Sequence, residues 1–251
     1  MARRGAQLRE HILRTAKAQF LETGFERTSM DAVAARAETS KRSLYAHFPS
    51  KDALFAGIVE LSRELYLEQI GVPDEDVADP VDAVVRYCGR LLQVLLWTTS
   101  VQSLRMGIAE AERVPELAAG YYESVVEIPT VRLAAYLEQR TGLAPEAAGA
   151  TARALVARTV YPEVMSCLLG VRPPLPRRPD PVTLADDVDL DRIRSCAVSL
   201  VPAGTRRRAP VLIGPRGTPR SVCGGRRCGP CSAAPARAAR RAGSRGRRRA
   251  R

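Results

Sequence analysis

Hydroxyl-bearing and cationic side chains gather in one short stretch of this 251-residue chain. The run Ser40-Lys41-Arg42-Ser43 is followed closely by Tyr45 and His47. Side chains of these types reach the phosphate oxygens and base edges of nucleic acids. A helix that begins here would add the positive end of its dipole for phosphate. The stretch therefore predicts binding to duplex DNA. Taken singly, Lys41, Arg42 and His47 would be interpreted as ordinary surface side chains, and Tyr45 as an ordinary core aromatic.

Two helices are expected before this stretch. The first is long and amphipathic, and Gly24 supplies its left-handed C-terminal cap. A short second helix follows, with Thr28 as the N-cap and Asp31 as the acid of a capping box. The apolar face of the first helix recurs at every fourth residue and consists of Leu8, Ile12, Ala16 and Phe20.

The cationic stretch itself is predicted to form a third helix over residues 41–48. Thr39 or Ser40 caps it, and Leu44 and Phe48 face inward one turn apart. So short a helix cannot stand alone, and the two preceding helices must hold it. The arrangement is that of a helix-turn-helix reader of the major groove.

This region resembles the DNA-binding domain of the tetracycline-repressor (TetR) family of bacterial regulators over residues 8–55. The motif residues are Gly24-Phe25, Thr28-Ser29, Ser40-Lys41, Leu44-Tyr45, His47-Phe48 and Lys51. The resemblance implies a three-helix domain whose third helix enters the major groove. By position, it implies DNA contacts from Thr28, Ser29, Lys41, Ser43, Tyr45, His47 and Lys51. The chemistry of the stretch itself adds Ser40 and Arg42.

One position departs from the family pattern. The family commonly has Ala-Gly-Val in the turn before the third helix, whereas this chain has Ala37-Glu38-Thr39. Glu38 must then adopt the backbone conformation that glycine adopts at little cost. Its negative charge also opposes DNA, so we expect somewhat weaker or more selective binding.

Charge divides the chain into three parts. Residues 1–55 hold 10 basic and 6 acidic side chains. Residues 56–201 hold 14 basic and 21 acidic side chains, and residues 202–251 hold 15 basic and no acidic side chains. We expect a DNA-binding domain at 1–55, a helical effector-binding and dimerisation domain at 56–201, and a disordered tail at 202–251. No apolar run is long enough to span a membrane, and the N-terminus does not resemble a signal peptide, so a cytoplasmic protein is expected.

The middle part predicts an all-helical body. Expected helices run from Lys51 to about Ile70, from Pro80 to Trp97, from Val101 to Arg113, from Glu116 to about Arg140 with an interruption at Pro129, and from Pro145 to Leu169 with one at Pro162. The resemblance implies a cavity among these helices for a small-molecule effector. Large, soft or amphipathic residues are the candidate walls, with core packing as the simpler alternative for each. They are Trp97, Met106, Tyr121, Tyr122, Tyr161, Met165 and Cys167.

The resemblance further implies a homodimer that binds an inverted-repeat operator in double-stranded DNA and is released by its effector, most simply as a repressor. The segments 145–169 and 187–201 are the expected dimer interface. The small residues that would permit close approach there are Ala147, Ala148, Gly149, Ala150 and Ala152. Between these segments, the proline-rich residues 172–181 predict an extended connector.

The tail offers an alternative function. Cys228-Gly229-Pro230-Cys231 matches a thioredoxin-like redox motif, and with Cys223 it supplies three possible zinc ligands. No strand precedes the motif and no fourth ligand lies nearby, so a thiol-disulfide oxidoreductase or zinc protein is the weaker interpretation. The abrupt change near residue 202 indicates either a basic tail with non-specific DNA affinity or translation in a shifted reading frame. No enzyme, cofactor or metal is expected.

Overall fold

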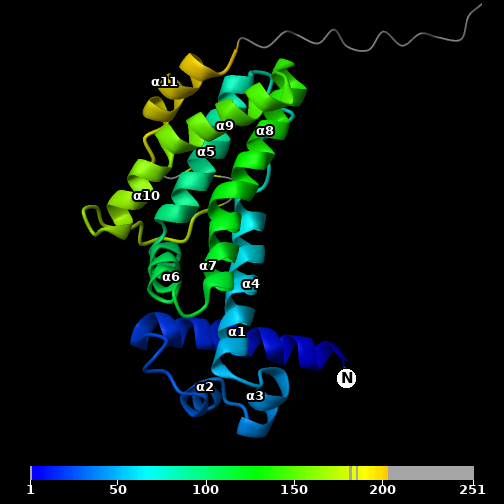
Figure 1. Cartoon of the computed structure of the whole chain (residues 1–251), viewed down its shortest axis with the longest axis vertical. Coiled ribbons are helices and arrows are strands. Elements are labelled where there is room, and N and C mark those ends of the chain that lie inside the picture. Colours follow the sequence, from blue (N-terminus) through cyan, green and yellow to red (C-terminus); the bar gives the residue numbers. More distant parts are fainter. Residues whose placement is uncertain (1, 181–182, 185, 203–251) are drawn as a thin grey trace, which may run out of the picture. The chain divides into compact units, whose positions relative to one another are not determined.

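Three N-terminal helices form a small unit, here called the head, in this computed structural model, which describes residues 2–180, 183–184 and 186–202 (Figure 1). They are α1 (Ala2–Thr23), α2 (Met30–Arg36) and α3 (Lys41–His47). Gly24 ends α1 with a φ of 87°, which confirms the predicted cap. The predicted cap of α2 is wrong by one residue, because Ser29 Oγ, not Thr28, accepts from Ala32 N at 3.1 Å.

The third helix is capped at its N-terminus and anchored by two buried side chains. Ser40 Oγ accepts from Ser43 N at 3.1 Å, which settles the choice of cap. Leu44 is fully buried and Phe48 is 2% exposed, as the four-residue spacing predicts. Burying a side chain of this size contributes about 1.5–3 kcal/mol, so these two residues hold a helix too short to be stable alone.

The remaining helices form the body. They are α4 (Lys51–Ile70), α5 (Pro80–Leu96), α6 (Thr98–Ala109), α7 (Pro115–Tyr122), the π-helical turn η1 (Glu123–Glu127), α8 (Ile128–Thr141), α9 (Pro145–Thr159), α10 (Tyr161–Leu168) and α11 (Leu190–Leu200). The described residues contain no β-strand, which confirms the all-helical prediction, and one isolated bridge joins Trp97 to Leu175. None of the described helices is long and apolar enough to cross a membrane.

Two hydrophobic clusters organise the described residues, and α4 belongs to both. Leu54, Phe55 and Ile58 pack into the head cluster, whereas Tyr66 and Ile70 pack into the body cluster. Figure 1 shows α4 running from the head into the body. The predicted boundary at residue 55 therefore falls inside a continuous helix, and residues of head and body form one compact unit.

The helix predicted from Glu116 to about Arg140 is interrupted before Pro129, not at it. A π-helical turn lies there, in which Ile128 N donates to Glu123 O, five residues back. Pro129 has no N–H to continue the α-helical pattern, and a wider turn accommodates its ring. Thr130 Oγ1 donates to Val126 O at 2.6 Å, and Tyr87 Oη donates to Pro129 O at 3.0 Å.

The expected disordered tail and its cysteines, Cys223, Cys228 and Cys231, lie outside the described residues. Within them, Cys88 and Cys167 are buried, and burial raises the pKa of the Cys88 thiol to about 12. Such a thiol is not a thiolate at neutral pH. The described part of the chain also contains no group of three His, Cys, Asp or Glu placed to hold a metal ion.

The turn before α3 stores backbone strain. Glu38 has a φ of 48°, the only positive value among the described residues other than glycine, as the missing family glycine predicts.

We expect Glu38→Gly to be more stable to urea than Glu38→Ala by about 0.5–1 kcal/mol, because both lose the charge but only glycine adopts this φ without strain. Equal unfolding midpoints for the two variants would show that this turn is not strained.

Candidate nucleic-acid interface and cavity

The solvent-facing side of α3 carries the cationic residues predicted from the sequence. Lys41, Arg42 and Tyr45 are exposed, with Tyr45 at 47%, and Ser43 and His47 are half-buried. Ser29 and Ser40 are exposed too, but each hydroxyl already accepts a hydrogen bond as a helix cap. The structure thus places the predicted cations Lys41 and Arg42 of α3 at the surface of the head.

Lys41 forms an ion pair with Asp31 of α2, Nζ to Oδ2 at 2.6 Å. Both side chains are more than half exposed, and exposed pairs of this kind contribute about 0–1 kcal/mol. A phosphate can therefore replace the carboxylate at little cost. Asp31 was expected in a capping box, and the pairing with Lys41 gives it a different partner.

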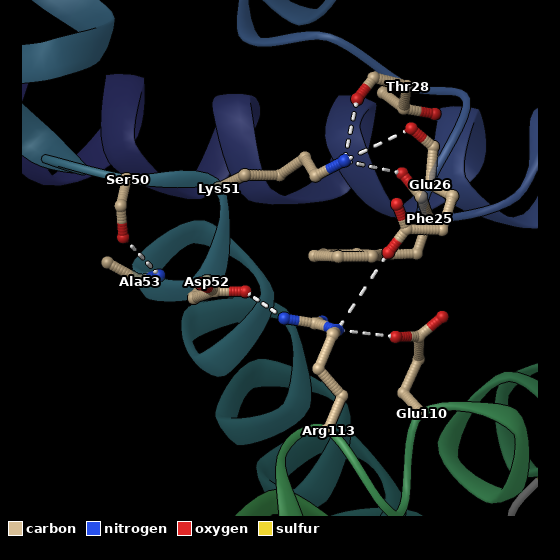
Figure 2. Close-up of polar contacts among 9 residues, drawn as sticks. All are labelled: Phe25, Glu26, Thr28, Ser50, Lys51, Asp52, Ala53, Glu110 and Arg113. Carbon is tan, nitrogen blue, oxygen red and sulfur yellow. Dashed lines mark hydrogen bonds and ion pairs between the residues drawn. The ribbon is translucent and has the colours of Figure 1, made fainter.

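Thr28 and Lys51 take positions that differ from those of surface contacts. Thr28 is 2% exposed, and its hydroxyl lies 2.8 Å from Gly24 O and 2.7 Å from Thr23 Oγ1. Lys51 Nζ donates to the carbonyl oxygens of Phe25, Glu26 and Thr28 at 3.0, 3.2 and 3.2 Å (Figure 2). Both side chains hold the turn between α1 and α2, and their polar groups are already engaged without DNA.

Arg113, in the turn between α6 and α7, joins the body to this same turn of the head. Its guanidinium pairs with Asp52, with Glu110 at 2.7 Å and with Glu26 at 3.9 Å. Figure 2 shows the ring of Phe25 between Lys51 and Arg113, and the Arg113 guanidinium carbon lies 4.0 Å from the ring centroid. The role of Arg113 could not be predicted from the sequence, because no local pattern distinguishes it from other surface arginines.

An apolar cavity of about 320 Å³, here called the apolar cavity, lies between α6, α7, η1 and α10. Four predicted wall residues line it: Tyr121, Tyr122, Tyr161 and Met165. Trp97 and Met106 do not, because Trp97 lies at a separate groove beside α1 and Met106 packs against the head cluster. Cys167 is buried in the body and is not part of the wall either.

Aliphatic residues complete the wall, and nothing in the sequence distinguishes them from core. They are Leu95, Leu104, Gly107, Ile108, Ala111, Ala118, Val125, Val126, Val164 and Leu168. Gly107 has a specific role, because a Cβ there would lie 2.9 Å from the ring of Tyr121. The glycine thus allows Tyr121 of α7 to pack directly on α6. Ile108, Tyr122 and Met165 are more than half exposed, so the cavity opens to the surface beside them.

Two family models match this chain. Residues 12–58 match the model described as bacterial regulatory proteins, tetR family. Residues 82–190 match the C-terminal domain of the AefR-like transcriptional repressors. The first range contains the helix-turn-helix, and the second contains the helices around the cavity. Neither range includes the cysteines of the tail.

Individual proteins are also similar to this chain in sequence or in fold. The nucleoid occlusion factor SlmA of Shewanella sp. (strain MR-4) is 38% identical over 89 residues, which is 35% of this chain and 43% of SlmA, so the match spans less than half of that relative. A TetR-family regulator from Mesorhizobium loti has a similar structure, with a TM-score of 0.62 and 20% identity, covering 78% of this chain and 96% of the other. The flavonoid-responsive regulator FrrA has a similar structure with a TM-score of 0.59 and 27% sequence identity. The match covers 77% of this chain and 94% of FrrA.

Substitutions at Tyr45 and Lys51 should separate contact from support. We expect Tyr45→Ala to weaken binding to the DNA upstream of the gene by about 1–2 kcal/mol, roughly tenfold, with unchanged unfolding. Lys51→Ala should also lower the free energy of unfolding, by about 2 kcal/mol, because three carbonyl groups lose a charged donor. Gel retardation and urea unfolding measure the two effects. Normal DNA binding by both variants would refute the assignment of α3 and its support.

Proposed function

The chain belongs to the TetR family of bacterial transcriptional regulators, and we propose that it is a homodimeric repressor that leaves its operator when a small molecule enters the body. The observation that carries the proposal is the geometry of α3. Lys41, Arg42 and Tyr45 face solvent, and Leu44 and Phe48 anchor the opposite side. A short helix held this way can enter a major groove without losing its own packing.

Phosphate contacts should supply much of the DNA affinity. Arg42 is exposed and forms no ion pair with the described residues, and the partner of Lys41 is an exposed carboxylate that is readily exchanged. Lys51 acts in this proposal as a positioning residue. Its ammonium fixes the turn that leads into α2, and α2 in turn packs against α3.

The dimer interface is assigned to the outer faces of α9 and α11. Ala147, Ala150 and Ala157 are exposed on α9, and Val198 is 63% exposed on α11. Of the small residues expected at the interface, Ala148 and Ala152 are buried within the same chain and cannot take part. Exposed alanines let two helices approach closely, and a large exposed valine gains by burial.

The apolar cavity is the proposed effector site. Its walls are mainly aliphatic and aromatic, as is typical of small-molecule sites. FrrA is described as flavonoid-responsive, and the model matched by residues 82–190 is described as a repressor. The first description supports a response to a small molecule, and the second supports repression.

Selection of bound fragments from a random DNA pool tests the operator and the dimer together. We expect an inverted repeat whose half-sites are about 34 Å apart or a multiple of this distance, because two identical heads must contact successive major-groove faces. Ala150→Glu should convert the dimer to a monomer by light scattering and weaken operator binding at least tenfold, since a charge would be buried at the interface.

Ala135→Glu is the matched control, because Ala135 is exposed on α8, outside the assigned interface. It should remain dimeric and bind the same sequences. Selection of sequences without two-fold symmetry, or dimeric Ala150→Glu, would contradict this assembly.

Arg113 is the proposed link between the cavity and the head. Ala111 lines the apolar cavity, and Arg113 follows two residues later with its contacts to Asp52 and Phe25. A shift of the α6–α7 turn that accompanies effector binding would therefore pull on the start of α4 and on the α1–α2 turn. This is a contact-based coupling between two sites through one side chain.

Hydrogen exchange tests this link without a known effector. In Arg113→Met, amides of residues 25–28 and 51–54 should exchange about fivefold faster, which corresponds to about 1 kcal/mol of lost local stability. Arg140→Met serves as the control, because Arg140 donates to Glu75 O and Val77 O and should affect only that loop. Unchanged exchange near Phe25 in Arg113→Met would exclude the link.

A further inference from the structure

A second, smaller pocket of about 60 Å³, here called the polar pocket, lies beside the apolar cavity. The two share Leu95, Leu104, Tyr121 and Val125 as lining residues, so the two spaces adjoin at these side chains. The polar pocket has room for a few water molecules or one carboxylate group. Its polar lining comes from α1, α4, α6, α7 and η1 and consists of Lys17, Ser62, Arg63, Tyr66, Ser100, Ser103, Tyr121 and Ser124.

The hydrogen-bonding capacity left over in this pocket is mainly donor capacity. The hydroxyl groups of Tyr66 and Tyr121 are buried without a partner, and so is Arg63 Nε. The Tyr66 residue as a whole is 9% exposed. The serines differ, because Ser103 and Ser124 already donate to carbonyl groups of their own helices. A buried donor without a partner costs about 1–3 kcal/mol, so a ligand that accepts from these groups would recover that cost.

Charge in the pocket is also unbalanced. Lys17 Nζ donates to Ser62 Oγ at 3.0 Å, and no carboxylate among the described residues pairs with it. Burial, with a smaller effect from Arg14, lowers the pKa of Lys17 to about 8, so the ammonium is still largely protonated at pH 7. Arg63 is already paired with Glu60 and Glu123, at 3.4 and 3.5 Å, so Lys17, and not Arg63, lacks a carboxylate partner among the described residues. The uncompensated charge at this point is therefore positive.

We infer that the polar pocket receives the carboxylate of an effector whose apolar body fills the apolar cavity. Carboxylate oxygens only accept hydrogen bonds, which matches the unused donors of Lys17, Tyr66 and Tyr121. An amine would bring a like charge beside Lys17, and a neutral alcohol would leave that ammonium without a counter-charge. This inference rests on the proposed ligand response and names the chemical class of the ligand.

The position of Lys17 has a direct consequence. It is the residue of α1 that lines the polar pocket, whereas the others belong to the body. A carboxylate held there would contact the head directly, in addition to the link through Arg113. Lys17 Nζ would then both bind the anion and help to set the position of α1 against α4, so ligand binding and that position would be coupled.

Binding of three decyl compounds to the purified full chain, without DNA, tests the inference. Decanoate, decan-1-ol and decylamine share the apolar body and differ in the end group, and titration calorimetry at pH 7 measures each. We expect decanoate to bind at least about tenfold more tightly than decan-1-ol, as a charge-assisted hydrogen bond predicts, and decylamine to bind most weakly. In Lys17→Met the preference for decanoate should fall to about twofold or less.

Arg14→Gln is the matched control, because it removes the same charge one turn earlier on α1, at an exposed pair with Glu10. It should keep the preference for decanoate. Tyr66→Phe removes one hydrogen-bond donor and no charge, so it should weaken the binding of decanoate a few-fold and that of decan-1-ol less. This variant also tests the inference if Lys17→Met does not fold. Equal binding of acid and alcohol, tighter binding of the amine, no binding of any of the three, or an unchanged preference in Lys17→Met would overturn the inference. Operator selection is independent of these ligands, so the proposed regulator would stand or fall separately.

Discussion

The position of α3, the proposed DNA-reading helix, depends on the ring of Phe25 and the two cations beside it. Lys51 Nζ lies 4.3 Å and the Arg113 guanidinium carbon 4.0 Å from the ring centroid. The ring also packs against Phe20 and Phe55 at 5.3 and 5.1 Å. Cation–π contacts contribute about 0.5–2 kcal/mol each, depending on exposure. Phe25 lies between α1 and α2, so the contacts that hold its ring also fix where α2 begins. The strained turn at Glu38 connects α2 to α3, and the position of α2 therefore determines that of α3.

A single helix shared by two cores makes head and body mechanically dependent. Leu54 and Ile58 of α4 are fully buried in the head cluster, and Ile70 of the same helix is fully buried in the body cluster. Close-packed cores do not deform continuously, so a displacement of one end of α4 must be matched at the other. The π-helical turn η1 contributes walls to both the apolar cavity and the polar pocket.

Features set by local chain chemistry could be predicted from the sequence. Gly24, Ser40 and Pro80 mark helix ends because caps and proline act within one turn, and the strain at Glu38 follows from a single missing glycine. Features set by tertiary contacts could not. Lys51 has a long flexible side chain, and only the fold shows that its ammonium reaches carbonyl groups more than 20 residues away.

The cavity illustrates the same limit. Tyr121 and Met165 could be chosen by chemical type, but Trp97 has the same character and lies elsewhere, and the aliphatic wall around Leu104 is indistinguishable from core. The chain order of the helices is readable from periodicity. Which of their apolar residues enclose a space depends on how the helices cross, and periodicity carries no information on that angle.

Two cations at the junction of head and body have opposite surroundings, and the contrast separates their roles. Arg113 has carboxylate partners in Asp52, Glu26 and Glu110, so its charge is balanced by the protein itself. Lys17 has one hydroxyl partner, and burial already disfavours its charged form. A balanced cation stabilises one arrangement of head and body whether or not a ligand is present. A half-buried cation without a carboxylate partner costs free energy until an anion binds, so in the proposed ligand response the surroundings of Lys17 would favour a change in state.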